Sequence, residues 1–395
     1  MELDSAFFDF ESLLKAAKKA GKSHKNRLYV KRFTFYLERE LIELGRDIRD
    51  HTYRPKPLRP FIIEEPKRRQ IHSSHFRDRV VHHAICARLE PKFEARFINN
   101  SYACRKDKGH IKGVTQLYES LRKISIDKLS YLLILKADIR SYFANIPHKR
   151  LLELISRDID DDTMYQTIQK ILAAHNGTTG VGLPIGNLTS QLFANVYLNE
   201  LDHFIDRRAI LIYYRYMDDF VMVFDRRYHD QQEILGKIRE FLKTHLYLAL
   251  NPSKVYCNHI IKGMEFLGYL VCPNRISIKN KNLARLKRKI KTRRHMVAAG
   301  TISPESYKRS LISWRGILTH SHNSEQKCQL VLWAVRKFGV KPGYLLWYFF
   351  LWTLKTPPLE IRRLQSSQKN AHIAYRLWLA NHDIDVLRSV ESLNK

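Results

Sequence analysis

The segment Tyr213–Phe224 constrains the fold more than any other part of the chain. It reads Tyr-Tyr-Arg-Tyr-Met-Asp-Asp-Phe-Val-Met-Val-Phe, so two short apolar, aromatic-rich runs flank the adjacent aspartates Asp218 and Asp219. This pattern predicts a β-hairpin whose tight turn carries the aspartate pair. Two carboxylates at the tip of a buried hairpin cost free energy unless positive charge lies beside them. Divalent cations that carry phosphates, Mg²⁺ above all, meet that requirement.

A third carboxylate, Asp138, ends the apolar strand candidate Leu132–Ala137. Nucleotidyl transfer requires two divalent ions about 3.5–4 Å apart, and carboxylates from adjacent strands converge naturally on such a pair. An aspartate at a strand end is by itself usually a cap or turn residue, so the prediction depends on the combination. We expect Asp138, Asp218 and Asp219 to be catalytic metal ligands for two Mg²⁺ ions, with Mn²⁺ as a substitute.

Two other segments have features suited to nucleotide contacts. Phe143 lies five residues after Asp138, where an aromatic ring can crowd the sugar C2′ and exclude a ribonucleotide; core packing is the alternative. Gly182–Gln191 is a glycine loop that runs into a predicted helix. Glycines allow the backbone to approach a base or phosphate closely, and a helix N-terminus favours anions. Most glycine loops are nevertheless plain turns.

Basic residues beside these segments suit phosphate groups. Lys67 and Arg69 can neutralise a triphosphate, as basic clamps do in phosphoryl transfer, although an exposed basic turn is equally consistent with the sequence. Lys254 can protonate or neutralise a pyrophosphate leaving group, and the alternative is a solvated loop lysine. His72, His75, His82 and His83 lie close in sequence without cysteine or carboxylate partners, so they do not indicate a zinc site.

The overall charge points to a polyanionic partner. The 395-residue chain has a formal net charge of +30, which opposes compaction unless a polyanion such as nucleic acid binds. Residues 279–294 contain nine Lys or Arg and no acidic residue, and they predict a helix with an apolar inner face and a phosphate-tracking outer face. A merely solvated helix face is the alternative.

Cysteine spacing and hydropathy bear on compartment and membrane contact. The five cysteines are widely spaced and include no Cys-x-x-Cys pair, so we expect reduced thiols in the cytoplasm. The most apolar run, Tyr344–Leu354, is shorter than the roughly 20 residues that span a bilayer. It predicts a buried helix, and no membrane is expected as a partner.

Hydrophobic periodicity predicts a mixed chain of helices and short strands. Strands are expected at 61–63, 132–138, in the hairpin and near 266–271. Helices are expected within 1–50 and at 76–89, 148–157, 162–174, 189–204, 230–246, 279–294, 304–318 and 324–339. The predicted organisation is an N-terminal helical, basic segment (1–60), a core (61–275), a helical segment (276–340) and an aromatic, helical C-terminal extension (341–395).

In this order, the motifs resemble those of reverse transcriptases over roughly residues 25–340. Matching stretches besides the Tyr-Met-Asp-Asp hairpin are Glu65–Arg69, Phe76–Ala84, Ser101–Gly109 and Gly186–Asn195. The chain is similar in particular to reverse transcriptases of diversity-generating retroelements. Most reverse transcriptases carry Gln-Gly-x-x-x-Ser-Pro in the glycine loop, and this chain has Ile185 in place of the Gln and Gln191 in place of the Pro. In that group the variant accompanies error-prone copying of adenines.

The resemblance implies an α+β right-hand polymerase with fingers, an antiparallel-sheet palm and a helical thumb. It implies metal binding by Asp138, Asp218 and the backbone of Ile139. The nucleotide contacts that it implies are made by Lys67, Arg69, Phe143, Gly186 and Gln191. Phe266–Tyr269 corresponds to the primer grip, and residues 279–339 to the thumb.

The expected function is RNA-directed DNA polymerisation, with a structured template RNA, a cDNA product and dNTPs as partners. An accessory protein or a second copy of the chain could bind through residues 344–395. Two alternatives stay open. One is an antiphage defence enzyme that copies its own noncoding RNA or synthesises DNA without a template. The other is a catalytically idle RNA-binding scaffold.

Overall fold

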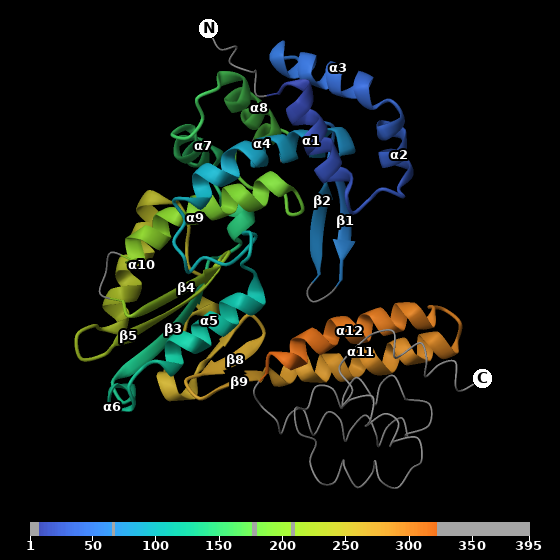
Figure 1. The fold of residues 1–395 in the computed structure, drawn as a ribbon. Coiled ribbons are helices and arrows are strands. Elements are labelled where there is room, and N and C mark those ends of the chain that lie inside the picture. Colours follow the sequence, from blue (N-terminus) through green and yellow to red (C-terminus); the bar gives the residue numbers. More distant parts are fainter. Residues whose placement is uncertain (1–7, 65–67, 176–179, 207–209, 322–395) are drawn as a thin grey trace. The chain divides into compact units, whose positions relative to one another are not determined.

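The computed structural model describes residues 8–64, 68–175, 180–206 and 210–321 (Figure 1). The chain divides into two compact units. The first is formed by Met1–Gly113 with Ser130–His259, and the second by Val114–Leu129 with Ile260–Lys395. Both units combine helices with antiparallel β-strands, which confirms the predicted α+β class.

A four-stranded antiparallel sheet with the order β4-β5-β3-β6 forms the centre of the first unit. Its strands are β3 Leu132–Asp138, β4 Ile212–Tyr216, β5 Asp219–Asp225 and β6 Tyr256–His259. The predicted strand and hairpin are confirmed, but the turn consists of Met217 and Asp218, and Asp219 already begins β5. Two-residue hairpin turns favour positive φ, and Met217 adopts a φ of 54°.

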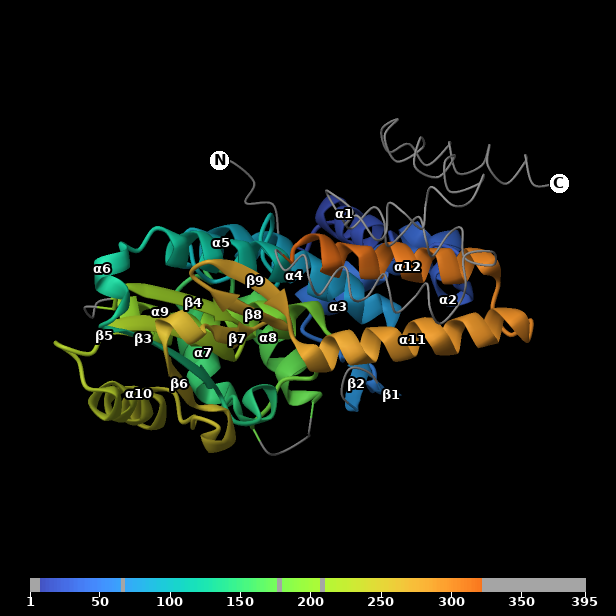
Figure 2. The ribbon, with the colours of Figure 1, turned by 90° about the horizontal axis from the view of Figure 1, so that it is seen from below.

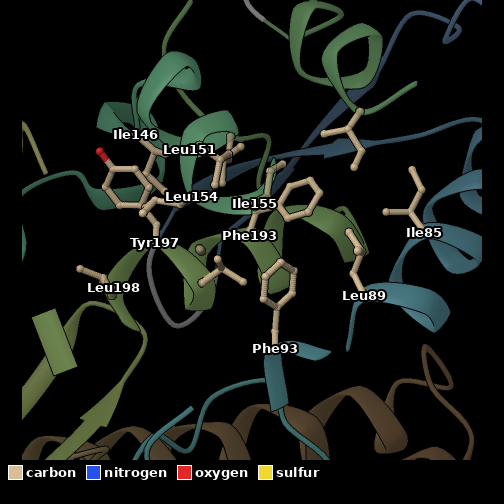
Figure 3. Packing of buried hydrophobic residues seen from close by; sticks show 14 of the residues in the cluster. Ile85, Leu89, Phe93, Ile146, Leu151, Leu154, Ile155, Phe193, Tyr197 and Leu198 are labelled. Carbon is tan, nitrogen blue, oxygen red and sulfur yellow. The ribbon is translucent and has the colours of Figure 1, made fainter. Parts of the chain in front are cut away.

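The first unit also contains the helices α1 Phe10–Gly21, α2 Leu28–Phe35, α3 Leu37–Arg49, α4 Phe76–Glu94, α7 His148–Ser156, α8 Asp162–Ala173, α9 Leu188–Asp206 and α10 Gln231–His245. Among them α9 contacts β4, α4 and α7 pack on α9, and α1 and α2 pack on α4. Figure 3 shows the core where Phe93 of α4, Leu154 of α7 and Phe193 of α9 meet. The same cluster includes Leu135 of β3 and Phe220 of β5, so the core lies between the sheet and the helices.

A separate antiparallel hairpin is formed by β1 Arg59–Ile63 and β2 Arg69–Ser73. The residues of β1 are exposed along the whole strand, as are the first two of β2. Lys67 belongs to the connection at residues 65–67, which lies outside the described residues. The predicted helix at 76–89 is present as α4, which continues past Pro91 to Glu94.

The second unit contains a three-stranded sheet, β7 Met264–Phe266, β8 Tyr269–Cys272 and β9 Arg275–Ile278. The prediction of one strand near 266–271 was wrong, because Leu267 and Gly268 adopt φ values of 49° and 90° and turn the chain between β7 and β8. The sheet leads into α11 Asn280–Ala298 and α12 Pro304–Thr319, which lie side by side in Figure 2. The second unit also includes most of helix α5 His110–Arg122, which starts in the first unit, and the short helix α6 Ile126–Leu129.

The predicted helix at 324–339 and the extension at 341–395 lie outside the described residues. Within the described residues, each helix is too short or too polar to cross a bilayer.

Candidate active site

Three aspartates lie together at one end of the central sheet. Asp138, the last residue of β3, is directly opposite Asp219, the first residue of β5. The Ile139 amide donates to the carbonyl oxygen of Asp218 at 3.2 Å. Ile139 and Asp218 are therefore a hydrogen-bonded pair of the ladder, and the adjoining pair, Asp138 and Asp219, is not hydrogen-bonded. In such a non-hydrogen-bonded pair the Cα atoms are about 4.5 Å apart and both side chains extend from the same face. The register therefore brings the predicted carboxylates together.

Two lysines neutralise two of these carboxylates. The Lys136 ammonium is 2.7 Å from Oδ2 of Asp219, and the Lys254 ammonium is 2.7 Å from Oδ2 of Asp138. Lys136 lies two residues before Asp138 on β3, so strand alternation places both on one face. The Lys136 side chain is 15% exposed and the Lys254 side chain is 38% exposed. The first lysine is thus part of the sheet, whereas the second reaches in from the more open turn Pro252–Lys254.

Negative charge is crowded at this end of the sheet. Burial raises the pKa of Asp219 to about 6; Lys136 opposes this shift, and the charges of Asp138 and Asp218 add to it. Burial also raises the pKa of Asp218, and the charge of Asp138 raises it further, while Lys254 and Arg69 act in the opposite direction. A cation placed here would relieve the repulsion between the carboxylates.

The residues fit a divalent cation chemically. Carboxylate oxygens are the ligands that Mg²⁺ prefers, and Oδ1 of Asp219 is buried without a hydrogen-bond partner. The described residues contain no group of three His, Cys, Asp or Glu side chains arranged as a metal cage. Because Lys136 and Lys254 already contact Asp219 and Asp138, an ion shared by these two aspartates would compete with the lysines. Ile139, the predicted backbone ligand, presents its carbonyl on the same side of the strand as its amide, toward Asp218.

Arg69 is the described member of the predicted basic clamp. It begins β2, is exposed, and lies close enough for its charge to lower the pKa of Asp218. Its predicted companion Lys67 lies outside the described residues. Lys254, predicted at the pyrophosphate, contacts Asp138 directly. Lys254 therefore contacts a carboxylate of the site directly, whereas Arg69 acts on Asp218 through its charge.

Phe143 lies in the 3-10 turn Tyr142–Asn145 that follows the Asp138 strand. Its side chain is partly buried against the main core, and its carbonyl oxygen accepts a hydrogen bond of 2.7 Å from the Leu183 amide. The turn is thereby joined to the glycine loop. Phe143 is half-buried, so the packing alternative accounts for part of its surroundings.

The glycine loop lies directly on β2. The His72 amide donates to the Ile185 carbonyl oxygen at 2.8 Å. Gly186 has a φ of 123°, and a Cβ atom added there would lie 2.7 Å from Cγ2 of Ile71. Glycine is therefore required for contact with β2, whether or not a nucleotide also binds. Gln191 lies in the first turn of α9 and is partly exposed.

A buried hydrogen-bond network that the sequence did not predict holds this loop. His82 of α4 bonds to the Ser74 hydroxyl at 3.2 Å through Nε2 and to the Thr189 hydroxyl at 2.8 Å through Nδ1. The Ser74 hydroxyl also donates to the Asn187 side chain. Burial lowers the pKa of His82 to about 3, so the ring is neutral at neutral pH. Adjacent histidines in the sequence gave no indication of these partners.

A second unpredicted network supports the aspartate turn. Arg215 of β4 and Asp202 of α9 form a fully buried, bidentate ion pair with both N–O distances at 2.6 Å. The arginine Nη1 donates to the carbonyl oxygen of Met217 at 3.2 Å and to Asn195 Oδ1 at 3.1 Å. Met217 immediately precedes Asp218, so the buried Arg215 stabilises the turn through its hydrogen bond to the Met217 carbonyl oxygen. An arginine inside an apolar strand signals a buried partner, but not which residue provides it.

Comparison with known proteins places this geometry in a family. The family model described as "Reverse transcriptase (RNA-dependent DNA polymerase)" matches residues 57–271, more than half of the chain. This range contains the three aspartates, Arg69, the glycine loop and Lys254. Phe266–Tyr269, the predicted primer grip, falls within the range, while α11 and α12 lie beyond it.

Curated relatives are similar at low identity. Protein YkfC of Escherichia coli (strain K12) is 24% identical over 257 residues, which cover 55% of this chain and 67% of that protein. Group II intron-encoded protein LtrA of Lactococcus lactis subsp. cremoris is 24% identical over 305 residues, which cover 59% of this chain and 50% of that protein. The chain thus spans about two thirds of the first relative and half of the second. With more than half of its length matched by the family model, the chain belongs to the reverse transcriptase (RNA-dependent DNA polymerase) family.

Proposed function

We propose that this chain is an RNA-directed DNA polymerase that extends a primer by two-metal nucleotidyl transfer. The observation that supports the proposal most is the strand register that sets Asp138 opposite Asp219, with Asp218 in the adjoining turn. The family match supports the same activity. The proposed substrates are dNTPs and a structured template RNA, and the product is cDNA.

Each predicted residue has a distinct task in this proposal. Bound Mg²⁺ ions would activate the primer 3′-hydroxyl and hold the triphosphate. Asp138, Asp218 and the Ile139 carbonyl are the proposed ligands, and Asp219 supports them. Lys254 leaves Asp138 and neutralises the pyrophosphate, for which its half-exposed position in a turn is suitable.

The nucleotide is proposed to lie between β2 and the glycine loop. Arg69, with Lys67, neutralises the triphosphate. Phe143 crowds the sugar C2′, and Gly186 and Gln191 contact the nucleotide. The hydrogen bond from His72 to Ile185 supports this arrangement because it joins the two walls of the proposed pocket.

The predicted organisation is retained as a proposal. Residues 61–275 form fingers and palm, 276–340 the thumb, and 1–60 and 341–395 the flanking segments. Leu286 and Ile290 of α11 are buried, as expected for a helix whose basic outer face tracks phosphates. We further propose a cytoplasmic setting; Cys86, Cys104, Cys257 and Cys272, all within the described part of the chain, are free thiols, in line with it. An accessory protein or a second copy remains the proposed partner of the C-terminal extension.

Two biological roles are supported by different observations. Ile185 and Gln191 favour an error-prone enzyme of the diversity-generating type. The similarity to the Group II intron-encoded protein LtrA favours an intron-encoded role. The defence enzyme and the idle scaffold are the other outcomes of the test below.

Primer extension on an RNA template, followed by sequencing of the cDNA, separates these possibilities. We expect extension that depends on Mg²⁺ and is lost in Asp218→Asn. Errors concentrated at template adenines indicate the retroelement role, and accurate copying indicates the intron-like role. Repetitive product without added template indicates the defence role. A wild-type protein that extends no primer, yet binds RNA as tightly as Asp218→Asn, contradicts the polymerase proposal and leaves the scaffold.

A further inference from the structure

The hydrogen-bond network around His82 joins three elements that are far apart in the sequence. Ser74 follows the end of β2, His82 lies in α4, and Asn187 and Thr189 lie at the start of α9. His82 is 4% exposed, and each of the other three side chains is also buried. The network is therefore closed to water, and every partner that is removed leaves a buried polar atom unpaired.

The chemistry of the partners fixes the proton on His82. The Ser74 hydroxyl has one proton, which it donates to Oδ1 of Asn187. Ser74 must then accept from His82, so the ring carries its proton on Nε2. Nδ1 is consequently an acceptor, and the Thr189 hydroxyl donates to it. Hydrogen-bond donation therefore runs from Thr189 through His82 and Ser74 to Asn187, and only a neutral imidazole allows this direction.

This network joins the end of β2 to the start of α9, the two elements proposed as walls of the nucleotide pocket. Arg69 belongs to β2, and Gln191 follows Thr189 by two residues in α9. The same walls touch through the His72–Ile185 backbone hydrogen bond and the close approach of Gly186 to Ile71. The His72–Ile185 hydrogen bond, the close approach of Gly186 to Ile71 and the buried side-chain network thus hold the basic wall and the glycine loop at a fixed spacing.

We propose that His82 is a positioning residue for the incoming nucleotide: by tying Ser74 to Thr189 it holds the glycine loop on β2 and thereby sets dNTP affinity and base selectivity. The inference rests on the proposed polymerase function. His82 itself touches neither metal nor substrate in this account, because its two ring nitrogens are both occupied by protein hydroxyls.

Thr189 provides the sharpest test, because its hydroxyl can be removed with little change in shape. Thr189→Val leaves Nδ1 of His82 without a donor, whereas Thr189→Ser keeps the hydroxyl. His83→Gln is the matched control, since His83 is the adjacent histidine of α4 and makes none of the hydrogen bonds of the network. His82→Leu removes the centre of the network, and thermal unfolding shows whether that variant folds.

Single-nucleotide extension kinetics and the misincorporation frequency are measured for each protein. For Thr189→Val we expect a KM for dNTP about five- to tenfold higher, as for one lost hydrogen bond, with kcat changed by about twofold or less. Misincorporation should rise with KM, and Thr189→Ser and His83→Gln should match the wild type. A Thr189→Val variant that is less stable but has unchanged KM and errors overturns the positioning role alone. A wild-type protein inactive on every template overturns the polymerase proposal, and this inference with it.

Discussion

The buried pair of Arg215 and Asp202 allows stability and activity to be separated experimentally. Both side chains are fully buried, and two hydrogen bonds of 2.6 Å join them. Arg215→Met leaves Asp202 as an unpaired buried carboxylate, and Asp202→Leu leaves an unpaired buried guanidinium. Breaking such a pair from one side costs about 3–5 kcal/mol of unfolding free energy.

Removing both charges together should cost much less. A buried ion pair replaced by apolar residues of similar volume is often close to neutral in stability. Asp202 also accepts a hydrogen bond of 2.7 Å from the Tyr213 hydroxyl, and losing that acceptor costs about 1–3 kcal/mol. The single variants sum to about 6–10 kcal/mol, whereas we expect about 1–3 kcal/mol for Arg215→Met combined with Asp202→Leu. The coupling energy is then at least about 3 kcal/mol.

Activity should not recover with stability. The double variant still lacks the Nη1 donor that bonds to the Met217 carbonyl oxygen ahead of Asp218. We therefore expect urea unfolding to show a nearly restored protein and primer extension to show a much lower kcat. Additive stability losses, within about 0.5 kcal/mol, would refute the coupled pair. Full activity in the double variant would refute the support of the aspartate turn.

Three further predictions concern the charge of Lys136, the protonation of His82 and the backbone conformation of Gly186. Lys136→Met removes the ammonium that lowers the pKa of Asp219, so the acid limb of the pH–rate profile should move to higher pH; an unchanged limb contradicts this assignment. The folded-state pKa of His82, about 3, is below the unfolded value of 6.5, so its stabilising effect is complete above pH 6.5 and declines as pH falls toward 3. Urea unfolding at pH 7 and pH 5 should show the wild type losing about 2 kcal/mol more than His82→Gln, and equal losses contradict the buried neutral ring. Gly186→Ala should destabilise by more than about 1 kcal/mol because of its positive φ and the contact with Ile71. The control Gly236→Ala, in open space on α10, should stabilise by up to about 1 kcal/mol in the same assay.

Local sequence patterns predicted the strands and turn of the site better than the buried hydrogen-bond networks that support them. The strand at Leu132–Asp138 and the hairpin around Asp218 follow from apolar runs interrupted by polar residues, because burial and strand alternation are local in sequence. The turn lies one position earlier than the sequence predicts, since nothing in a Met-Asp-Asp sequence requires Met217 to adopt a positive φ. Leu267 likewise adopts a positive φ, which split a single predicted strand into two.

The supporting networks could not be predicted because their partners are distant in sequence. Ser74 and Asn187 are 113 residues apart, and His82 and Thr189 are 107 apart. In the sequence, the adjacent histidines His82 and His83 indicate neither a metal site nor these hydroxyl partners, because tertiary packing brings Ser74 and Thr189 to His82. Conversely, the glycine loop was predicted to approach a nucleotide, while the structure shows Gly186 in close contact with β2. Local sequence patterns thus predict where the charged residues of the site lie, whereas tertiary packing determines which residues support them.

The most direct test asks whether the carboxylates of β3 and the hairpin share cations. Electron paramagnetic resonance counts the Mn²⁺ ions that the protein binds in the presence of a non-hydrolysable dNTP. We predict two protein-bound ions in the wild type, with at least one lost in Asp138→Asn and in Asp218→Asn. Asp225→Asn, at the far end of β5 and paired with Arg227, should bind as the wild type does. Equal binding by all four proteins would contradict this prediction.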